Sequence, residues 1–296
     1  MTAPNPPPSR WPALAAVNLA AVIFGCNALF GRIDASPVWL VAGRMGFAAL
    51  ALLLIGLARR TLVRPSPRQI AGCALSGVLI ALHWITFFAS VQAGGVAIAT
   101  LTVSGFPLFT ILLNAARDRK PPQGIEVAAS LAIMAAIALI ARPSGAPGVV
   151  TGAILGLTSA ALFSVYSLAS ERLVRELGPL NLSMLQYALA AMLLAPILPF
   201  AKAVAGLDGW LALVALGVFG TALSFQLYLF ALGRMPAVVC GGFTCLEPVY
   251  AIALAALLFS EPISPLVALS AAIIVGASLV LLSGSKDPPA AEPGVL

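Results

Sequence analysis

Charged residues are scarce in this chain. They make up 9% of its 296 residues, whereas a typical soluble domain has about 25%. Apolar residues account for 61% of the chain, and the mean hydropathy is +1.05; soluble domains are about 45 to 50% apolar. This composition excludes an ordinary soluble domain and predicts an integral membrane protein, whose surroundings are the lipid bilayer.

The chain also lacks the motifs of metal sites and enzymes. Its four cysteines lie in apolar segments without a CxxC or Cys/His cluster, and no HExxH motif, Ser/His/Asp set or group of aspartates is present. We therefore expect no metal, no cofactor and no enzymatic activity. A membrane enzyme acting on lipid carriers and a purely structural membrane partner stay as alternatives from other classes.

The basic residues are placed as topology signals. The net charge is +6, but the Lys and Arg side chains lie in short connections between apolar segments, which argues against a nucleic-acid partner. Twelve of the sixteen fall on one side if the apolar segments alternate across a membrane, and only Arg32, Arg142 and Lys202 fall on the other. The positive-inside rule then predicts that both termini are cytoplasmic.

Ten apolar segments are long enough to be membrane spans, since a helix needs about 20 residues to cross about 30 Å of hydrocarbon. The sequence therefore predicts an all-α protein of ten transmembrane helices. The predicted spans cover residues 13–31, 37–57, 69–91, 96–115, 124–141, 149–170, 179–200, 209–232, 236–258 and 264–283.

The two halves of the chain resemble each other. Phe88 and Ala89 align with Phe230 and Ala231, and Pro107 aligns with Pro248. Two repeats of five spans each must run through the membrane in opposite directions, because five is odd. The predicted organisation is a cytoplasmic tail (1–12), a first repeat (13–141), a linker (142–148), a second repeat (149–283) and a disordered cytoplasmic tail (284–296). Spans 124–141 and 264–283 have almost no polar side chains and are expected to be scaffold.

Interrupted spans in corresponding places of two repeats are typical of a transporter's substrate site, because a proline inside the membrane frees backbone carbonyls. The sequence therefore favours a carrier that works by alternating access. The expected hinges are Pro107, Pro248, Gly94 and Gly95.

Three ionisable side chains lie deep within the predicted spans: Arg44, His83 and Glu247. Such groups cost about 2.5 to 3.5 kcal/mol to insert and are functional candidates. For Glu247, an ion pair with Arg44 or a bond to nearby backbone competes with a role in substrate binding or ion coupling. His83, the one histidine of the chain, is either a pocket residue or a packed one.

Other polar and aromatic candidates follow from the repeat and from neighbouring spans. Trp84 aligns with Gln226 and Arg44 with Gln186, and the remaining candidates are Asn27, Tyr166, Tyr187 and Tyr250. Carriers of phosphorylated solutes need several Lys or Arg in the membrane, and this chain offers one. A small neutral or zwitterionic solute is the expected substrate.

Several motifs together resemble the EamA family of the drug/metabolite transporter superfamily. They are the run Phe24, Gly25, Cys26, Asn27, the arginine Arg44, the pair Glu247 and Pro248, and Glu261 followed by Pro262. The resemblance covers almost the whole chain as two copies. It implies a multi-pass transporter, with a substrate cavity formed by spans one to four and six to nine.

Within that family, the single histidine of the third span is similar to that of bacterial aromatic amino-acid exporters of the inner membrane. This resemblance implies that His83, Phe106 and Tyr166 contribute to the cavity. It also implies export of aromatic and other neutral amino acids, with a multidrug or other metabolite exporter as the alternative. A proton is a candidate coupling ion, a facilitator without one is equally compatible, and a monomer or weak dimer is expected.

Overall fold

The computed structural model describes residues 11–27, 30, 33–141, 148–250 and 265–284, and within these ranges every regular element is helical. The all-α prediction is confirmed for this part of the chain. Of the predicted tails, the structure describes only residues 11, 12 and 284. Residues 142–147 of the predicted linker and the Glu261–Pro262 pair also lie outside the described residues.

Within the described residues, the first half of the chain forms α1 (Trp11–Asn27), α2 (Pro37–Arg59), α3 (Pro67–Val103), α4 (Phe106–Asp118) and α5 (Gly124–Ala141). The second half contains α6 (Val149–Leu194), the 3-10 helix η2 (Ala195–Phe200), α7 (Gly206–Gly217), the π-helix η3 (Val218–Leu223), α8 (Ser224–Leu232), α9 (Ala237–Thr244) and α11 (Pro265–Gly284). Among the described residues, four segments are long and apolar enough to cross a membrane: Pro37–Arg59, Pro67–Val96, Val150–Phe200 and Gly206–Leu232. The count of ten spans stays a prediction.

Local sequence explains where α2 and α3 begin. The hydroxyl of Ser36 accepts a hydrogen bond from the backbone N–H of Trp39, 3.3 Å away, and Pro37 is the first residue of α2. Ser66 caps α3 in the same way through Gln69, whose side chain accepts a bond from the Ser66 N–H at 2.9 Å. Serine followed by proline is a strong start signal because proline needs no donor there.

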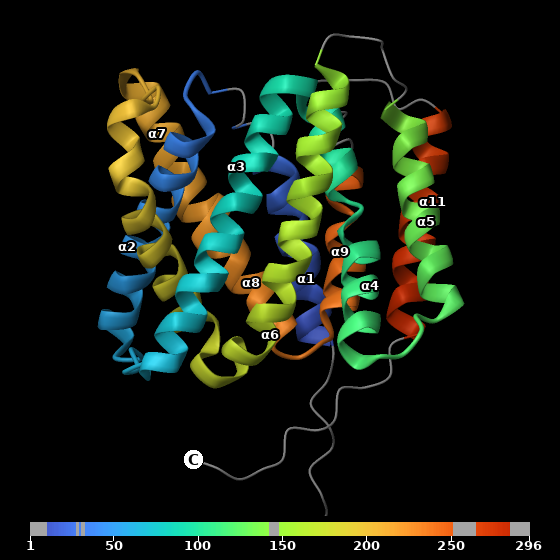
Figure 1. Ribbon diagram of the computed structural model, residues 1–296, viewed down its shortest axis with the longest axis horizontal. Coiled ribbons are helices and arrows are strands. Elements are labelled where there is room, and N and C mark those ends of the chain that lie inside the picture. Colours follow the sequence, from blue (N-terminus) through green and yellow to red (C-terminus); the bar gives the residue numbers. More distant parts are fainter. Residues whose placement is uncertain (1–10, 28–29, 31–32, 142–147, 251–264, 285–296) are drawn as a thin grey trace, which may run out of the picture.

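Two glycines let single long helices change direction. Gly95 in α3 has φ +86°, and Gly178 in α6 has φ +73°. Positive φ is strained for residues with a Cβ. In Figure 1 the two parts of α6 on either side of Gly178 run in opposite directions. The first part covers the predicted span 149–170, and the second part together with η2 covers 179–200.

A helix break precedes each of the two repeat-related prolines. Residues 104–105 form a turn before α4, in which Pro107 is the second residue; residues 245–246 form a turn after α9, and the chain is helical again from Glu247, with Pro248 second. Proline lacks the N–H that would continue the preceding helix. The interruption predicted near Pro107 in the span 96–115 is therefore present, because α3 ends at Val103 and α4 begins at Phe106.

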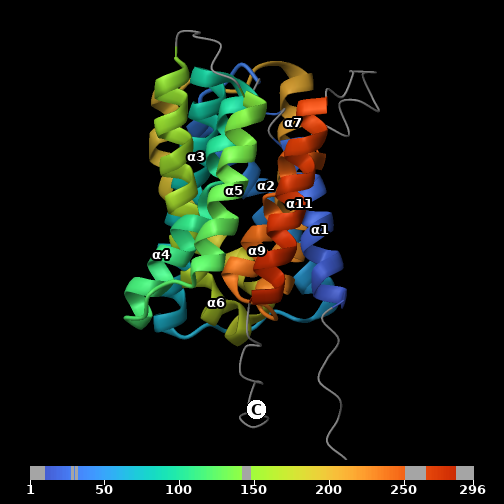
Figure 2. The same ribbon diagram turned by 90° about the vertical axis from the view of Figure 1, so that its right-hand side faces the viewer.

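The helices stand side by side in one bundle (Figure 1). The first helices of the two halves, α1 and α6, begin at opposite ends of this bundle, the lower and the upper one in the view. Helices α5 and α11 pack on each other along one edge and run in opposite directions, which Figure 2 shows face on. They occupy the outer position expected of scaffold helices.

Helices α3 and α6 make the most extensive contact in the bundle. At one crossing, Gly94 and Gly152 are so close that a Cβ added to Gly152 would lie 2.7 Å from the Cα of Gly94. The Ser90 hydroxyl there donates a 2.6 Å hydrogen bond to the Gly152 carbonyl. Small residues permit this approach, which provides van der Waals contact where lipid removes the hydrophobic driving force.

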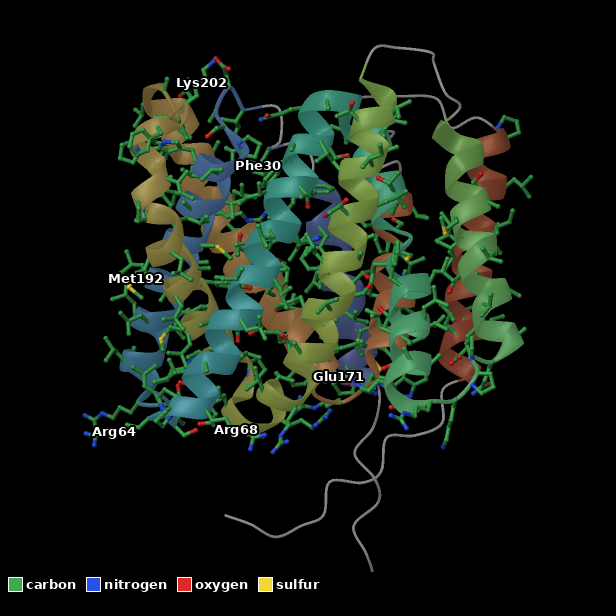
Figure 3. The ribbon with its side chains drawn as sticks, in the orientation of Figure 1. Phe30, Arg64, Arg68, Glu171, Met192 and Lys202 are labelled. Atoms are coloured by element: carbon green, nitrogen blue, oxygen red, sulfur yellow. The ribbon has the colours of Figure 1, made fainter. Side chains whose placement is uncertain are left out.

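The charged ends of the bundle are distinct. Arg64 and Arg68 lie with Glu171 at one end, and Lys202 lies at the opposite end (Figure 3). This placement agrees with the predicted alternation of the basic residues, while the side of the membrane that each end faces stays a prediction.

Candidate functional site

A cavity of about 550 Å³, including its opening, lies between the two helix breaks. Its walls come from α1, α2, α3, α6, α8 and the residues around both breaks. The lining residues are Phe24, Asn27, Arg44, His83, Trp84, Phe87, Val103, Ser104, Phe106, Phe163, Phe225, Thr244, Cys245 and Glu247.

The two breaks touch each other at the cavity. Cys245, in the second break, donates a 3.1 Å hydrogen bond from its thiol to the carbonyl oxygen of Ser104, in the first. These residues are 141 positions apart, which is the spacing of the repeat-related prolines. The Ser104 carbonyl is available because Leu108 bonds instead to Gly105. The repeat therefore brings equivalent positions of the two halves together at one wall of the cavity.

Glu247 is the first residue of the helical segment after the second break, and its side chain lines the cavity. Its carboxylate accepts no hydrogen bond and forms no ion pair with the residues that the structure describes. The interpretation of Glu247 as the ion-pair partner of Arg44, or as a group bonded to nearby backbone, is therefore wrong for the described part of the chain. An uncompensated carboxylate in an apolar site is costly unless a ligand or a proton meets it.

Arg44 is held by the second repeat instead. Its Nε donates to the Thr221 hydroxyl at 2.8 Å and its Nη2 to the Gly220 carbonyl at 3.2 Å. The guanidinium carbon lies 3.8 Å from the centre of the Trp84 ring, a distance at which a cation is attracted to the ring face. The side chain is buried, yet it lines the cavity.

The π-helix η3 makes this anchorage possible. The Gly220 carbonyl accepts hydrogen bonds from Arg44, from Asn27 at 2.6 Å and from Ser224 at 2.8 Å. A single π-helical turn loosens the usual backbone ladder, and such turns are frequent at functional sites. One backbone carbonyl thus ties together side chains of α1, α2 and α8.

His83 lines the cavity from α3 and bonds to α6. Its Nδ1 lies 3.0 Å from the carbonyl oxygen and 2.8 Å from the hydroxyl of Ser159. The ring stacks on Phe163, with 4.7 Å between the ring centres, and on Phe87, with 6.4 Å between the centres. Both open alternatives therefore apply, because His83 is packed and also faces the cavity.

Six of the sequence-derived candidates meet at this cavity: Asn27, Arg44, His83, Trp84, Phe106 and Glu247. Tyr166 and Tyr187 do not line it. Both are fully buried, Tyr166 stacked on Phe163 at 5.7 Å and Tyr187 against Trp84 at 5.8 Å. They pack against aromatic residues that line the cavity. Sequence periodicity could not show this, because the packing of neighbouring helices decides which aromatic rings reach the cavity.

The two glutamines and Tyr250 also lie away from the cavity lining. Gln186 donates to the hydroxyls of Ser76 and Ser170, and Gln226 donates to the Pro179 carbonyl and Ser183. Tyr250 donates to the side-chain oxygen of Asn18 at 2.9 Å. The repeat alignment that suggested the two glutamines relates backbone positions and does not predict side-chain contacts. In the structure their amides hydrogen-bond to other parts of the helix bundle.

The expected hinge residues fall into two groups. Pro107 and Pro248 follow the breaks, and Gly95 has the non-helical backbone of α3. Gly94, in contrast, is where α6 approaches α3 most closely. Its lack of a side chain serves helix packing in this structure.

The sequence patterns did not indicate much of the aromatic and small-residue lining: Phe87, Val103, Ser104, Phe163, Phe225, Thr244 and Cys245. Ser104, Thr244 and Cys245 lie within four residues of the repeat-related prolines, so that spacing could have nominated them. No local signal distinguishes Phe163 or Phe225 from other phenylalanines in apolar spans.

The chain matches the EamA-like transporter family twice, over residues 11–142 and 150–283. It is also 24% identical, over 225 residues, to the uncharacterized transporter YwfM of Bacillus subtilis (strain 168), covering 74% of this chain and 75% of that protein. A solved crystal structure with 24% sequence identity aligns with a TM-score of 0.74, covering 92% of this chain and 98% of that one. At this identity the last match shows the fold alone.

The two family matches span most of the chain, and they agree with its apolar helices and its paired helix breaks. The chain belongs to the EamA-like transporter family and is a membrane transporter of the drug/metabolite transporter superfamily.

Proposed function

We propose that this transporter carries zwitterionic amino acids with aromatic or other apolar side chains, exporting them by alternating access. The observation that carries the proposal is the carboxylate of Glu247, which faces the cavity without a partner in the described chain, on walls that also present Arg44. A zwitterion supplies a cation for one group and an anion for the other.

The two charges can be met by one ligand because they do not neutralise each other. A guanidinium has five N–H groups, and two of those of Arg44 are used by Thr221 and Gly220. The remaining donors suit a carboxylate, which arginine binds in a fixed planar geometry. The carboxylate of Glu247 suits an ammonium group.

The remaining walls suit an apolar body. Besides His83, six aromatic side chains line the cavity: Phe24, Trp84, Phe87, Phe106, Phe163 and Phe225. Such rings provide large contact areas and prefer offset or edge-to-face neighbours. Neutral amino acids with aromatic side chains match this lining better than small polar solutes.

The direction and the setting of transport complete the proposal. Export across a bacterial inner membrane is supported by the family resemblance, and cytoplasmic termini are supported by the distribution of Lys and Arg. A proton is the candidate coupling ion, with Glu247 as the group that would exchange it for substrate. Organic cations are the alternative substrates, because a carboxylate among aromatic rings also attracts a lone positive charge.

Counterflow of labelled amino acids into proteoliposomes tests this function. We expect phenylalanine, tyrosine or tryptophan to exchange, and Glu247→Gln to reduce the exchange at least about 10-fold, the equivalent of one charge-assisted hydrogen bond. Asp208→Asn, which alters an exposed carboxylate in the first turn of α7, is the matched control and should exchange normally.

Two results would contradict the proposal. If organic cations without a carboxylate exchange while the amino acids do not, the alternative substrate class replaces it. If Glu247→Gln exchanges amino acids as fast as Asp208→Asn, the unpartnered carboxylate is not part of the substrate site. Imposing a pH gradient in the same vesicles tests proton coupling.

A further inference from the structure

The environment of the His83 ring specifies which nitrogen carries its proton. The Ser159 carbonyl oxygen lies 3.0 Å from Nδ1, and a carbonyl oxygen can only accept a hydrogen bond. A lone pair on Nδ1 would therefore point at the lone pairs of that oxygen. Only a protonated Nδ1 makes this contact favourable.

The Ser159 hydroxyl strengthens the same choice. It donates a 2.9 Å hydrogen bond to the backbone carbonyl of His83, while its oxygen lies 2.8 Å from Nδ1. Since a hydroxyl has one proton, using it on that carbonyl leaves the Ser159 oxygen as an acceptor toward the ring. The carbonyl oxygen and the hydroxyl oxygen of Ser159 then both accept a hydrogen bond from the Nδ1–H group.

The opposite nitrogen is left for the cavity. In a neutral imidazole with a protonated Nδ1, Nε2 carries a lone pair and accepts hydrogen bonds. No described residue provides Nε2 with a partner, and His83 lines the cavity. The contacts of Nδ1 with Ser159 oppose a flip of the ring about its Cβ–Cγ bond, and stacking on Phe163 and Phe87 supports the plane of the ring.

We propose that Ser159 is a positioning residue that holds His83 in the Nδ1–H tautomer, so that Nε2 accepts a hydrogen bond from an N–H or O–H donor of the substrate. The inference deepens the proposed function and rests on it for the identity of the substrate. It assigns the substrate a hydrogen-bond donor that His83 recognises, in addition to the contacts of its charges with Arg44 and Glu247.

The tautomer can be measured directly because His83 is the one histidine of the chain. Protein labelled with ¹⁵N-histidine, and purified through a tag that contains no histidine, gives two ring ¹⁵N resonances that report which nitrogen is protonated. We expect a protonated Nδ1 and an unprotonated Nε2 at neutral pH. A protonated Nε2, or an equal mixture of tautomers, overturns the proposal whatever the protein transports.

Ser159 variants separate positioning from simple packing. Ser159→Ala keeps the carbonyl acceptor but loses the hydroxyl, so the population of the Nδ1–H tautomer should fall by about 3- to 10-fold relative to the other tautomer, the effect of one hydrogen bond. Ser159→Thr restores a hydroxyl and should restore the tautomer. The control is Thr158→Ala, which removes an exposed hydroxyl one residue away that bonds only to Ile154.

The substrate's donor is identified with three ligands added to the labelled protein. Tryptophan carries both an ammonium and an indole N–H, 1-methyltryptophan lacks the indole donor, and indole lacks the ammonium. The Nε2 resonance should shift with tryptophan. If the shift remains with 1-methyltryptophan, the donor is the ammonium group; if it remains with indole, the donor is the indole N–H. If tryptophan exchanges in counterflow but leaves Nε2 unshifted, the acceptor role is wrong while the proposed function stands. If tryptophan neither exchanges nor shifts Nε2, both the substrate assignment and the acceptor role fail.

Discussion

Arg44 shows how a single charge is kept within this bundle without a carboxylate partner. Its burial would be prohibitive for an unpartnered ion, but it has a hydroxyl, a backbone carbonyl and an indole face. Two of these three groups belong to the opposite repeat. The arginine is therefore a bond between the halves as well as a cavity residue.

The Thr221 hydroxyl should be essential to this arrangement. Thr221→Val leaves the Nε–H of Arg44 buried without its 2.8 Å partner, so we expect a stability loss of about 1 to 3 kcal/mol. Thermal unfolding in detergent measures it as a lower apparent Tm. Adding Thr221→Val to Arg44→Met should cost much less, because methionine has no N–H to leave without a partner.

Thr158→Val is the control for that measurement. Its hydroxyl is exposed and bonds within α6 to Ile154, so the apparent Tm should hardly change. Equal losses from Thr221→Val with and without Arg44 would mean that the threonine acts independently of the arginine.

At the scale of helices, the crossing of α3 and α6 depends on backbone contact. Gly94 and Gly152 meet there without side chains between them, and the Ser90 hydroxyl bonds across to the Gly152 carbonyl. The same two helices bring His83 to Ser159. Their separation therefore sets both the packing of the bundle and one wall of the cavity.

Gly152→Ala should force these helices apart. Its Cβ would lie 2.7 Å from the Cα of Gly94 and 3.2 Å from the Ser90 carbonyl oxygen, and overpacking of this kind costs about 1 to 3 kcal/mol. We expect a lower apparent Tm and slower counterflow. In α11, a Cβ on Gly276 would meet no atom within 4 Å, so Gly276→Ala should keep or slightly raise the Tm. Similar losses in both variants would indicate that alanine, and not the crossing, is responsible.

For the whole molecule, the charged ends predict its orientation in the membrane. Arg64 and Arg68 lie at one end of the bundle and Lys202 at the other (Figure 3). The excess of Lys and Arg belongs to the end with Arg64, which the positive-inside rule places in the cytoplasm. The cavity then lies between a basic cytoplasmic end and an outer end with few charges.

Cysteine labelling tests this orientation. A membrane-impermeant maleimide added to intact cells, or to right-side-out vesicles, should label Lys202→Cys, and it should label Arg64→Cys only after the membrane is opened. Background labelling should be low, because Cys73, Cys240 and Cys245 are buried and Cys26 is half-buried. Labelling of Arg64→Cys from outside, with Lys202→Cys protected, would reverse the predicted topology.

Sequence reasoning was most successful where one residue type carries the information by itself. Arg44, His83 and Glu247 stood out because charges are expensive in lipid, and all three line the cavity. The paired prolines located both helix breaks for a similar reason, since a missing N–H has the same effect wherever the chain lies. The sequence did not show which aromatic residues line the cavity: Phe163 lines it, whereas Tyr166, about one helical turn away, is buried and does not.

The sequence by itself determined the membrane class, the helical content, the two repeats and the charged residues of the cavity, because composition and chain periodicity depend on neighbours along the chain. Only the tertiary structure decided the partners. It joined Arg44 to Gly220 and Thr221, left Glu247 without a partner in the described chain, and brought Ser159 to His83 and Cys245 to Ser104. These contacts span 76 to 177 residues, and such distant pairings follow from how helices pack on one another, which no local pattern encodes.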